Sequence, residues 1–502
     1  MPPRQDVFDD FRLSGAKVIV AVESAEEFLG GWRIHATIFH ARADLGTGHA
    51  TLFCVVRRYR SYYPTATHDR LLRFSRKTCN VNDDSAIDFQ DLKNLEGETE
   101  LAPPELFAAN LIEWSLERHA SDLFVSDIDG AVLISVRRLG RIEPVRKLAR
   151  TYGHRLQGHL RVLAGADAGE SVRPVEGRGN ITTPDGSKAH LRLSSIPTLY
   201  GQDVAIRLFD PVRGARPLDQ LGMDSVDVES IEHLMGQRSG LILVTGPVAS
   251  GKSSTLYAMM NELNDGSRKI HTIEDPIEHA LSGVMQSQTN ARLGLGFAEL
   301  LTVVLRHSPD VIMIGEIRDR QTAETAIRAG ASGQLVLATV HSTSTAEAVD
   351  MMLQYDSDHI FLASALSGVI NQRLVRRLCP VCRKPAEGSH LTDVPERIGS
   401  RMQGAEASVF VPFGCHLCFE GGYDQLIALP EIMVVDTVIE EAIAKRASAS
   451  DLEAITTDDG MLRLAEVAHS YVLRGLTSLD EINRAVTDPH LTSLQRRVEK
   501  AG

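Results

Sequence analysis

The sequence predicts an α/β protein whose C-terminal half is a mostly parallel sheet, preceded by an α+β domain and a separate strand-rich N-terminal domain. Short Val, Ile and Leu runs beyond residue 240 alternate with helical patterns, which is typical of strands buried on both faces. Earlier strands instead alternate apolar and polar residues. A length of 502 residues also implies about three domains.

Residues 1–100 are expected to form an α+β partner-binding domain that is rich in strands. A period of two in KVIVAV (17–22), WRIHATIFHA (32–41) and ATLFCVVRRY (50–59) predicts three strands, the last two joined by a turn-rich segment. The polar and acidic composition from about residue 79 to 104 predicts a linker.

Residues 101–210 predict an α+β domain. A helix is expected over 103–120, because a proline stands near its start and apolar residues return at helical spacing. Strands are expected at 131–140, 188–196 and 203–210. The segment 211–223, with two prolines and two glycines, predicts the linker to a C-terminal domain over 224–502.

Composition limits the possible classes of protein. Hydrophobic residues make up 43% and charged residues 24%, which is typical of a folded soluble chain. The most apolar run, 360–370, is far shorter than the roughly 18 residues of a membrane span and predicts a buried helix. Acidic residues stand where a signal peptide needs an apolar core, so we expect a cytoplasmic protein. A net charge of −13 argues against direct nucleic-acid binding.

The segment LVTGPVASGKSST (243–255) has the Gly-x4-Gly-Lys-Ser spacing of a phosphate-binding loop between a strand and a helix. Its backbone N–H groups would surround phosphate oxygens, Lys252 would contact the β- and γ-phosphates, and Ser253 would bind Mg²⁺. The alternative is a chance glycine-rich turn. The expected nucleotide contacts are Gly246, Pro247, Val248, Ala249, Ser250, Gly251, Lys252, Ser253 and Ser254.

Acidic and histidine side chains follow three further predicted strands, at the edge where ligands gather in open α/β sheets. Glu316 could orient and deprotonate the attacking water, or only pair with Arg318. Glu274, near Asp275, suits a contact to Mg²⁺ or water, although clustered acids can also form a solvated turn. His341 could sense the γ-phosphate or be structural.

Four of the six cysteines form two C-x-x-C pairs. In a reducing compartment such pairs suggest a structural metal before a disulfide. Four thiolates would suit a tetrahedral zinc within an excursion over 379–418; disulfides or free thiols are the alternative. The expected ligands are Cys379, Cys382, Cys415 and Cys418.

The order of these motifs, from about residue 101 to 432, resembles the assembly ATPases of type II secretion and type IV pili. On that resemblance, 246–253 is the Walker A motif, 272–279 the aspartate box and 305–319 the Walker B motif, and His341 lies in the histidine box. Arg192 and Arg207 fall where the family's preceding domain supplies arginines to the phosphates.

The resemblance implies a RecA-like ATPase core behind a PAS-like second domain, Mg-ATP, and a homohexamer peripheral to the inner membrane. Its partners would be a polytopic inner-membrane platform protein and a cytoplasmic adaptor, and its work pilus assembly or type II-like protein secretion. Alternatives are a conjugation-associated or DNA-translocating RecA-like ATPase, and a nucleotide-gated scaffold with little hydrolysis.

Departures from the family's usual sequence suggest a divergent member of this family. Ala249 stands where the family usually has a glycine, and Gln425-Leu426 stands where it usually has a Gly-Arg pair. The first hundred residues do not visibly match the family's N-terminal domain. Because both spacing glycines, Lys252 and Ser253 are kept, we expect altered nucleotide kinetics before lost binding.

Overall fold

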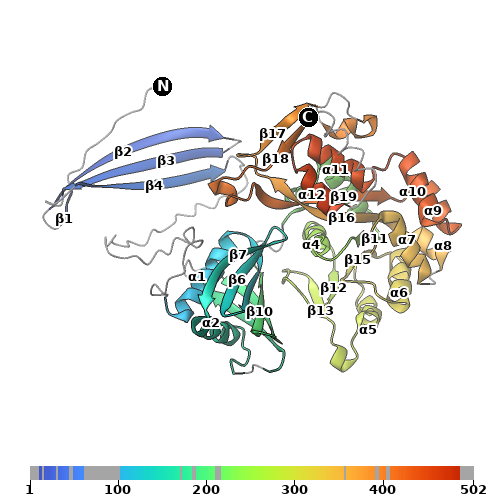
Figure 1. The fold of residues 1–502 in the computed structure, drawn as a ribbon. Coiled ribbons are helices and arrows are strands. Elements are labelled where there is room, and N and C mark those ends of the chain that lie inside the picture. The colour runs from blue at the N-terminus through green and yellow to red at the C-terminus, as the bar shows by residue number, and fades with distance from the viewer. Residues whose placement is uncertain are drawn as a thin grey trace. The chain divides into compact units, whose positions relative to one another are not determined.

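The computed structural model describes 11–13, 16–29, 32–44, 49–61, 102–169, 172–183, 188–209, 216–355, 358–390, 395–402 and 407–486. The chain divides into two compact units, Met1–Asp88 and Phe89–Gly502. Figure 1 shows both units, coloured along the chain.

The described part of the first unit is a four-stranded antiparallel sheet in the order β1-β2-β3-β4. The three strands predicted from the period-two pattern are β2, β3 and β4. Most of the predicted linker after residue 79 lies outside the described residues. The strands are β1 (Phe11–Leu13), β2 (Ala16–Leu29), β3 (Trp32–Asp44) and β4 (His49–Ser61).

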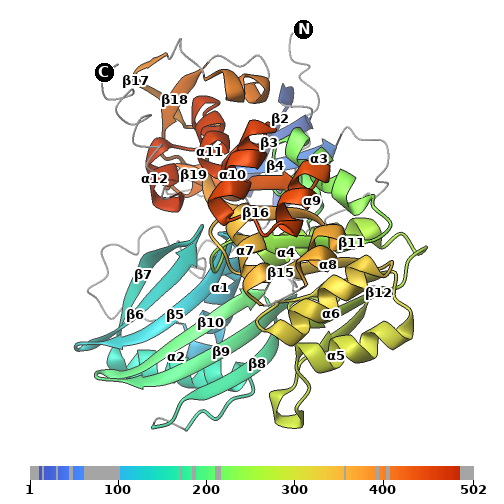
Figure 2. The ribbon, with the colours of Figure 1, turned by 90° about the vertical axis from the view of Figure 1, so that its right-hand side faces the viewer.

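Residues 102–209 of the second unit, called the middle module, form an antiparallel sheet in the order β7-β6-β5-β10-β9-β8. Helices α1 (Pro104–Glu117) and α2 (Arg150–Leu163) bury apolar side chains against its inner face (Figure 2). The outer face carries polar residues, because strand side chains alternate between faces. The strands are β5 (Ala120–Ile128), β6 (Ala131–Arg138), β7 (Arg141–Ala149), β8 (Val175–Thr182), β9 (Lys188–Thr198) and β10 (Gly201–Phe209).

Residues 216–486, called the C-terminal module, are built on a seven-stranded sheet in the order β13-β12-β14-β15-β11-β16-β19. Every neighbouring pair is parallel except β16 and β19, so the predicted mostly parallel sheet is confirmed. The strands are β11 (Gly240–Thr245), β12 (Ile270–Glu274), β13 (Met285–Gln288), β14 (Val311–Ile314), β15 (Leu335–Thr339), β16 (Leu366–Leu378) and β19 (Tyr423–Val434).

Helices cover both faces of this sheet. Leu241 and Leu243 of β11 join one apolar cluster, and Ile242 and Val244 join the cluster on the other face. The strand is therefore buried at every position. The helices are α3 (Ser225–Met235), α4 (Lys252–Leu263), α5 (Phe297–Val304), α6 (Arg320–Ala331), α7 (Thr345–Gln354), α8 (His359–Ala365), α9 (Thr437–Ala444), α10 (Ala449–Asp458), α11 (Leu464–Leu473) and α12 (Leu479–Ala485), with short 3₁₀ turns η2 (Leu218–Gln220), η3 (Ala291–Leu293) and η4 (Leu305–His307).

The prediction of one buried helix over 360–370 is wrong in its second half. Helix α8 ends at Ala365, and β16 begins at Leu366 and pairs in parallel with β11. A short apolar run suits either a buried helix or a strand buried on both faces, so periodicity alone does not decide between them. Within the described residues, no helix has both the length and the apolar character needed to cross a membrane.

An excursion leaves the sheet between β16 and β19. It contains a two-stranded antiparallel sheet of β17 (Lys384–His390) and β18 (Ser408–Val411), together with η5 (Glu396–Met402) and η6 (His416–Cys418). Its apolar residues pack with α11 and α12. The excursion and the C-terminal helices therefore share one core.

Candidate nucleotide site and metal centre

The predicted phosphate-binding loop joins the interior strand β11 to α4. Gly246 and Gly251 have positive φ angles of 140° and 89°. A Cβ atom on Gly246 would lie 2.4 Å from the Gln372 carbonyl oxygen, so this close approach excludes a side chain. Ala249 also has a positive φ, 63°, although it is not glycine. The position that departs from the family pattern is thus one where the backbone favours glycine.

Lys252, the first residue of α4, directs its ammonium group back over the loop. Its Nζ donates to the carbonyl oxygens of Gly246 (2.7 Å) and Pro247 (3.1 Å) and lies 3.3 Å from His341 Nδ1. Burial lowers the pKa of Lys252, and the nearby Glu316 opposes that shift. The loop therefore presents a cation that is only partly hydrated.

Glu316 follows β14 and contacts two cationic or titratable groups. Its Oε1 lies 3.0 Å from His341 Nε2, and its Oε2 accepts a hydrogen bond from Arg318 Nε at 2.7 Å. The pairing with Arg318, left open from the sequence, is present together with the His341 contact. Since His341 also contacts Lys252, the four side chains form one continuous chain.

Glu274, at the end of β12, is 4% exposed. Its Oε1 accepts from Thr272 Oγ1 (2.5 Å) and Gln286 Nε2 (3.0 Å), and its Oε2 accepts from the Tyr257 hydroxyl. Burial raises the pKa of Tyr257, and Glu274 raises it further. Tyr257 and Gln286 were missed from the sequence, because neither belongs to a spacing motif.

The loop and the strand ends line one pocket of about 270 Å³. The structure thus brings together Lys252, Glu316, His341 and Glu274, as the sequence predicted. Of the predicted nucleotide contacts, four line this pocket. Its polar and loop residues include Val248, Ala249, Lys252, Ser253, Glu274, Asp275, Glu278, Glu316, Arg318 and His341.

Arg192 and Arg207 lie on neighbouring strands of the middle module, directly opposite each other. Arg178 of β8 is opposite Arg192 in turn, so three exposed arginines cross the outer face of the sheet. Arg207 Nε lies 3.1 Å from Asp122 Oδ1. Burial raises the pKa of Glu278, and the charge of Arg207 opposes that shift. Neither predicted arginine is among the described residues that line the pocket around Lys252. Arg178 was missed as a site residue, because it belongs to no spacing motif.

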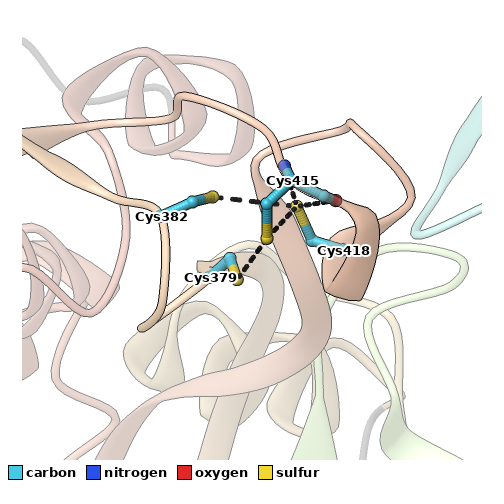
Figure 3. A group of neighbouring side chains, drawn as sticks. All are labelled: Cys379, Cys382, Cys415 and Cys418. Atoms are coloured by element: carbon cyan, nitrogen blue, oxygen red, sulfur yellow. Dashed lines mark hydrogen bonds between the residues drawn. The ribbon is translucent and has the colours of Figure 1, made fainter. Parts of the chain in front are cut away.

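The four cysteines converge from the two ends of the excursion (Figure 3). All their sulfur atoms lie within 4.8 Å of one another, and three pairs are 3.8–3.9 Å apart. A disulfide needs about 2.05 Å, so none is present among these four. Zinc–sulfur bonds of about 2.3 Å in a tetrahedron place sulfurs about 3.8 Å apart. The four thiols therefore fit Zn²⁺.

The sequence model of the family described as "Type II/IV secretion system protein" matches residues 98–484. The chain belongs to this family. It is 34% identical over 379 residues to the type II secretion system protein E of Aeromonas hydrophila, covering 75% of this chain and 74% of the relative. It is 32% identical over 386 residues to the type IV pilus assembly ATPase TfpB of Acinetobacter baylyi, covering 75% and 64%.

Solved structures in the same comparison agree with the fold. The pilus retraction motor PilT with bound ADP is 25% identical, with a TM-score of 0.51 over 77% of this chain and 98% of that chain. The Legionella pneumophila ATPase DotB has a TM-score of 0.57 at 19% identity, over 78% and 97%, and supports the fold alone. The family model and the relatives at 32–34% identity confirm the resemblance to the secretion and pilus-assembly ATPases.

A second cavity of about 260 Å³ borders the start of α4. Gly251, Ser254 and Thr255 line it on the side of the loop, and His119 and Leu139 line it from the middle module. Gln425 and Leu426, which replace the Gly-Arg pair usual in this secretion family, also line it. The sequence signalled these two residues as departures, but only the fold places them beside the loop.

Proposed function

We propose that the chain is an ATP-hydrolysing motor that drives type IV pilus assembly or type II-like protein secretion at the inner membrane. The observation that carries the proposal is the continuous contact of Lys252, His341, Glu316 and Arg318 beside the phosphate-binding loop. Membership of the secretion family and relatives named as pilus assembly ATPases support the same activity.

The loop residues hold the phosphates through backbone N–H groups at the start of α4, where the helix dipole favours negative charge. Lys252 exchanges its contacts with the loop carbonyls for the β- and γ-phosphates. Ser253 supplies a hydroxyl to Mg²⁺, and the ion, when bound, screens the phosphate charge. Because the Lys252 ammonium already lies beside the loop, its binding requires only a local shift.

Glu316 orients the attacking water and accepts its proton. His341 touches both Glu316 and Lys252, so a γ-phosphate at Lys252 alters the position of His341 and through it the carboxylate. Glu274 is held by three donors, which fits a positioning role beside the metal and water rather than proton transfer.

Arg192 and Arg207 belong to a different module from the loop, so they can reach phosphate only through domain movement or from a neighbouring subunit. Guanidinium groups delivered in this way stabilise the transferring phosphoryl group and couple nucleotide state to rotation between modules. This arrangement supports a homohexamer that works on a polytopic inner-membrane platform protein and a cytoplasmic adaptor. We infer peripheral attachment to the membrane through these partners and no direct nucleic-acid contact.

The second cavity takes the base of the nucleotide. It begins at Gly251 and Ser254, the loop residues past which the base extends once the phosphates are held. Gln372 and Gln425 supply amide groups that can hydrogen-bond adenine, and Leu374 and Leu426 supply apolar walls. The cysteine cluster would hold a structural Zn²⁺ that takes no part in the hydrolysis.

The test is ATP hydrolysis by the purified full chain and by Glu316→Gln. We expect Glu316→Gln to bind ATP but to hydrolyse it about a hundredfold more slowly or worse, since a positioned general base contributes roughly 10²–10⁴-fold. The matched control is Glu324→Gln on α6, which removes a surface pair with Arg320 away from the pocket. Hydrolysis by Glu316→Gln at the wild-type rate would remove the catalytic assignment. A wild-type chain that binds ATP without turning it over would favour the scaffold alternative.

A further inference from the structure

The hairpin between β6 and β7 of the middle module has an unfavourable turn. Its two central residues, Leu139 and Gly140, have φ angles of 47° and 78°. Such two-residue turns favour Asn-Gly, because asparagine tolerates the left-handed conformation and leucine does not. Leu139 nevertheless stands at the tip of the hairpin and is only 7% exposed. A partner outside the hairpin must therefore cover this leucine.

That partner lies beside the cysteine cluster. Leu139 packs with Leu378 and Tyr423 in a small apolar cluster separate from the main cores. Leu378 immediately precedes Cys379, and Tyr423 begins β19 just after the second cysteine pair. The hairpin tip of the middle module thus contacts the two chain segments that carry the cysteines.

A second contact flanks the first. Phe419 directly follows Cys418 and has a φ of 52°. The guanidinium groups of Arg118 and Arg138, both in the middle module, lie 4.8 Å and 5.7 Å from the centre of its ring. These distances are within the range of cation–π attraction. The aromatic ring of Phe419 therefore contacts two arginines from the neighbouring module.

Arg138 also reaches the backbone of the cysteine turn. Its Nη2 lies 3.4 Å from the Cys418 carbonyl oxygen, and the side chain is nearly buried. A Cβ atom on Gly421 would lie 2.4 Å from the same Nη2, so a side chain at this position would displace the guanidinium. The lack of a side chain at Gly421 therefore leaves room for the Arg138 guanidinium.

The cysteine sulfurs organise the turn. Cys418 Sγ accepts hydrogen bonds from the backbone N–H groups of Cys415 (3.2 Å) and Gly422 (3.3 Å). The segment between these two groups carries Phe419 and the carbonyl that faces Arg138. A metal held by the four thiolates would fix this segment, because structural zinc sites contribute folding free energy directly.

We propose that the tetracysteine knuckle, defined as residues 378–382 and 415–423, is the docking surface for the middle module, so that metal loading controls how firmly that module is held. The occupants are the β6–β7 tip and the end of α1. Docking also completes the wall of the second cavity, since His119 and Leu139 line it. The docking itself does not depend on ATP hydrolysis, and so it can fail or succeed independently of the proposed motor function.

Hydrogen exchange of the full-length, zinc-loaded chain tests the docking surface. In Phe419→Ala we expect amides of residues 136–141 to exchange roughly fivefold faster, the effect of losing a cation–π contact that holds the tip. Zinc should stay at one ion per chain. The matched control is Phe413→Ala in the same excursion, because that ring is exposed and faces Lys384. The control should leave exchange at 136–141 unchanged.

Leu139→Asn provides a second variant that leaves the knuckle sequence intact. Asparagine suits the turn better than leucine, so a purely local role predicts slower exchange in the hairpin and no change elsewhere. Docking instead predicts faster exchange at residues 415–423, on the other side of the contact. Removing zinc from the wild-type chain by chelation should likewise speed exchange at 136–141. The proposal is overturned if the amides of residues 136–141 exchange at the wild-type rate both in the chelated chain and in Phe419→Ala. It is also overturned if exchange at residues 415–423 is unchanged in Leu139→Asn.

Discussion

Two sets of ion pairs use the same chemistry in opposite surroundings. In the nucleotide pocket, Glu316 pairs with Arg318 and His341, whose side chains are 58% and 45% exposed. Between β16 and α12, Arg376 pairs with Glu481, and their side chains are 10% and 0% exposed. Exposed pairs contribute about 0–1 kcal/mol, whereas breaking a buried pair costs about 3–5 kcal/mol. Burial, and not the residue types, separates the two.

The difference explains which contacts can be exchanged. The side chains of the pocket can exchange their present contacts for contacts with phosphate oxygens at a small cost in free energy, because water already solvates part of each charged group. Glu481 instead receives hydrogen bonds from Arg376 Nε (2.8 Å) and Nη2 (2.7 Å), in a position that water does not reach. The buried pair therefore fixes α12 to the sheet, and the pocket pairs remain available for ligand binding.

The largest effect is expected from Glu481→Ala. Removing the carboxylate leaves Arg376 buried without its partner, so the free energy of unfolding of the C-terminal module should fall by about 3–5 kcal/mol. Chemical denaturation of the full chain measures this loss. The matched control is Glu441→Ala, which breaks an exposed pair with Lys445 on α9 and should change stability by less than about 0.5 kcal/mol.

The same variant has a defined pH dependence. Burial raises the pKa of Glu481, but hydrogen bonds from Arg484 and Arg376 outweigh it, so the pKa lies below the ordinary 4.5. A lowered carboxylate pKa stabilises the fold fully above pH 4.5, and this contribution is lost as the pH falls through the folded-state value. The stability difference between wild type and Glu481→Ala should therefore be constant near neutrality and shrink on acidification. A difference that grows below pH 4.5 would contradict this sign.

In the pocket, Lys252→Ala should affect binding and leave folding nearly unchanged. Loss of one partner of a charge pair with phosphate costs about 2–5 kcal/mol, which weakens ATP binding by about thirtyfold or more. Titration with a fluorescent ATP analogue measures the change. Lys269→Ala is the matched control, since Lys269 is exposed and its Nζ contacts only the His307 carbonyl oxygen at 2.5 Å among the described interactions. If Lys252→Ala instead unfolds the chain, the contrast between the two sets of ion pairs fails.

Sequence patterns predicted the strands and helices that are determined by their own residues. The parallel core could be predicted, because a strand such as β11 carries an unbroken apolar run, Leu241–Val244, and ends in a spacing motif. The cluster of Lys252, Glu316 and His341 could also be predicted, since strand ends of a parallel sheet meet at one edge. The switch from helix to strand at Leu366 could not, because its cause is pairing with β11, more than a hundred residues away.

Tertiary contacts of single side chains could not be predicted from the sequence either. Tyr257 and Gln286 reach Glu274 from different elements and carry no motif. Leu139 looks like an ordinary strand-end leucine until its φ of 47° and its burial are known. Such side chains acquire their roles from tertiary packing, which single-residue preferences do not encode.

The smallest effect is expected from Ala249→Gly in the phosphate-binding loop. Glycine relieves the left-handed strain at φ 63° but adds freedom to the unfolded chain, and these terms are each about 1 kcal/mol, so stability should change by less than about 0.5 kcal/mol. A freer loop should release nucleotide a few-fold faster, because 1.4 kcal/mol corresponds to about a tenfold change. Stopped-flow release of a fluorescent nucleotide measures this rate. Arg446→Gly, which replaces another non-glycine residue of positive φ (54°) that does not line the pocket, should leave it unchanged. If Ala249→Gly weakens nucleotide binding as much as Lys252→Ala does, Ala249 shapes the nucleotide-bound loop and is not merely a tolerated replacement for glycine.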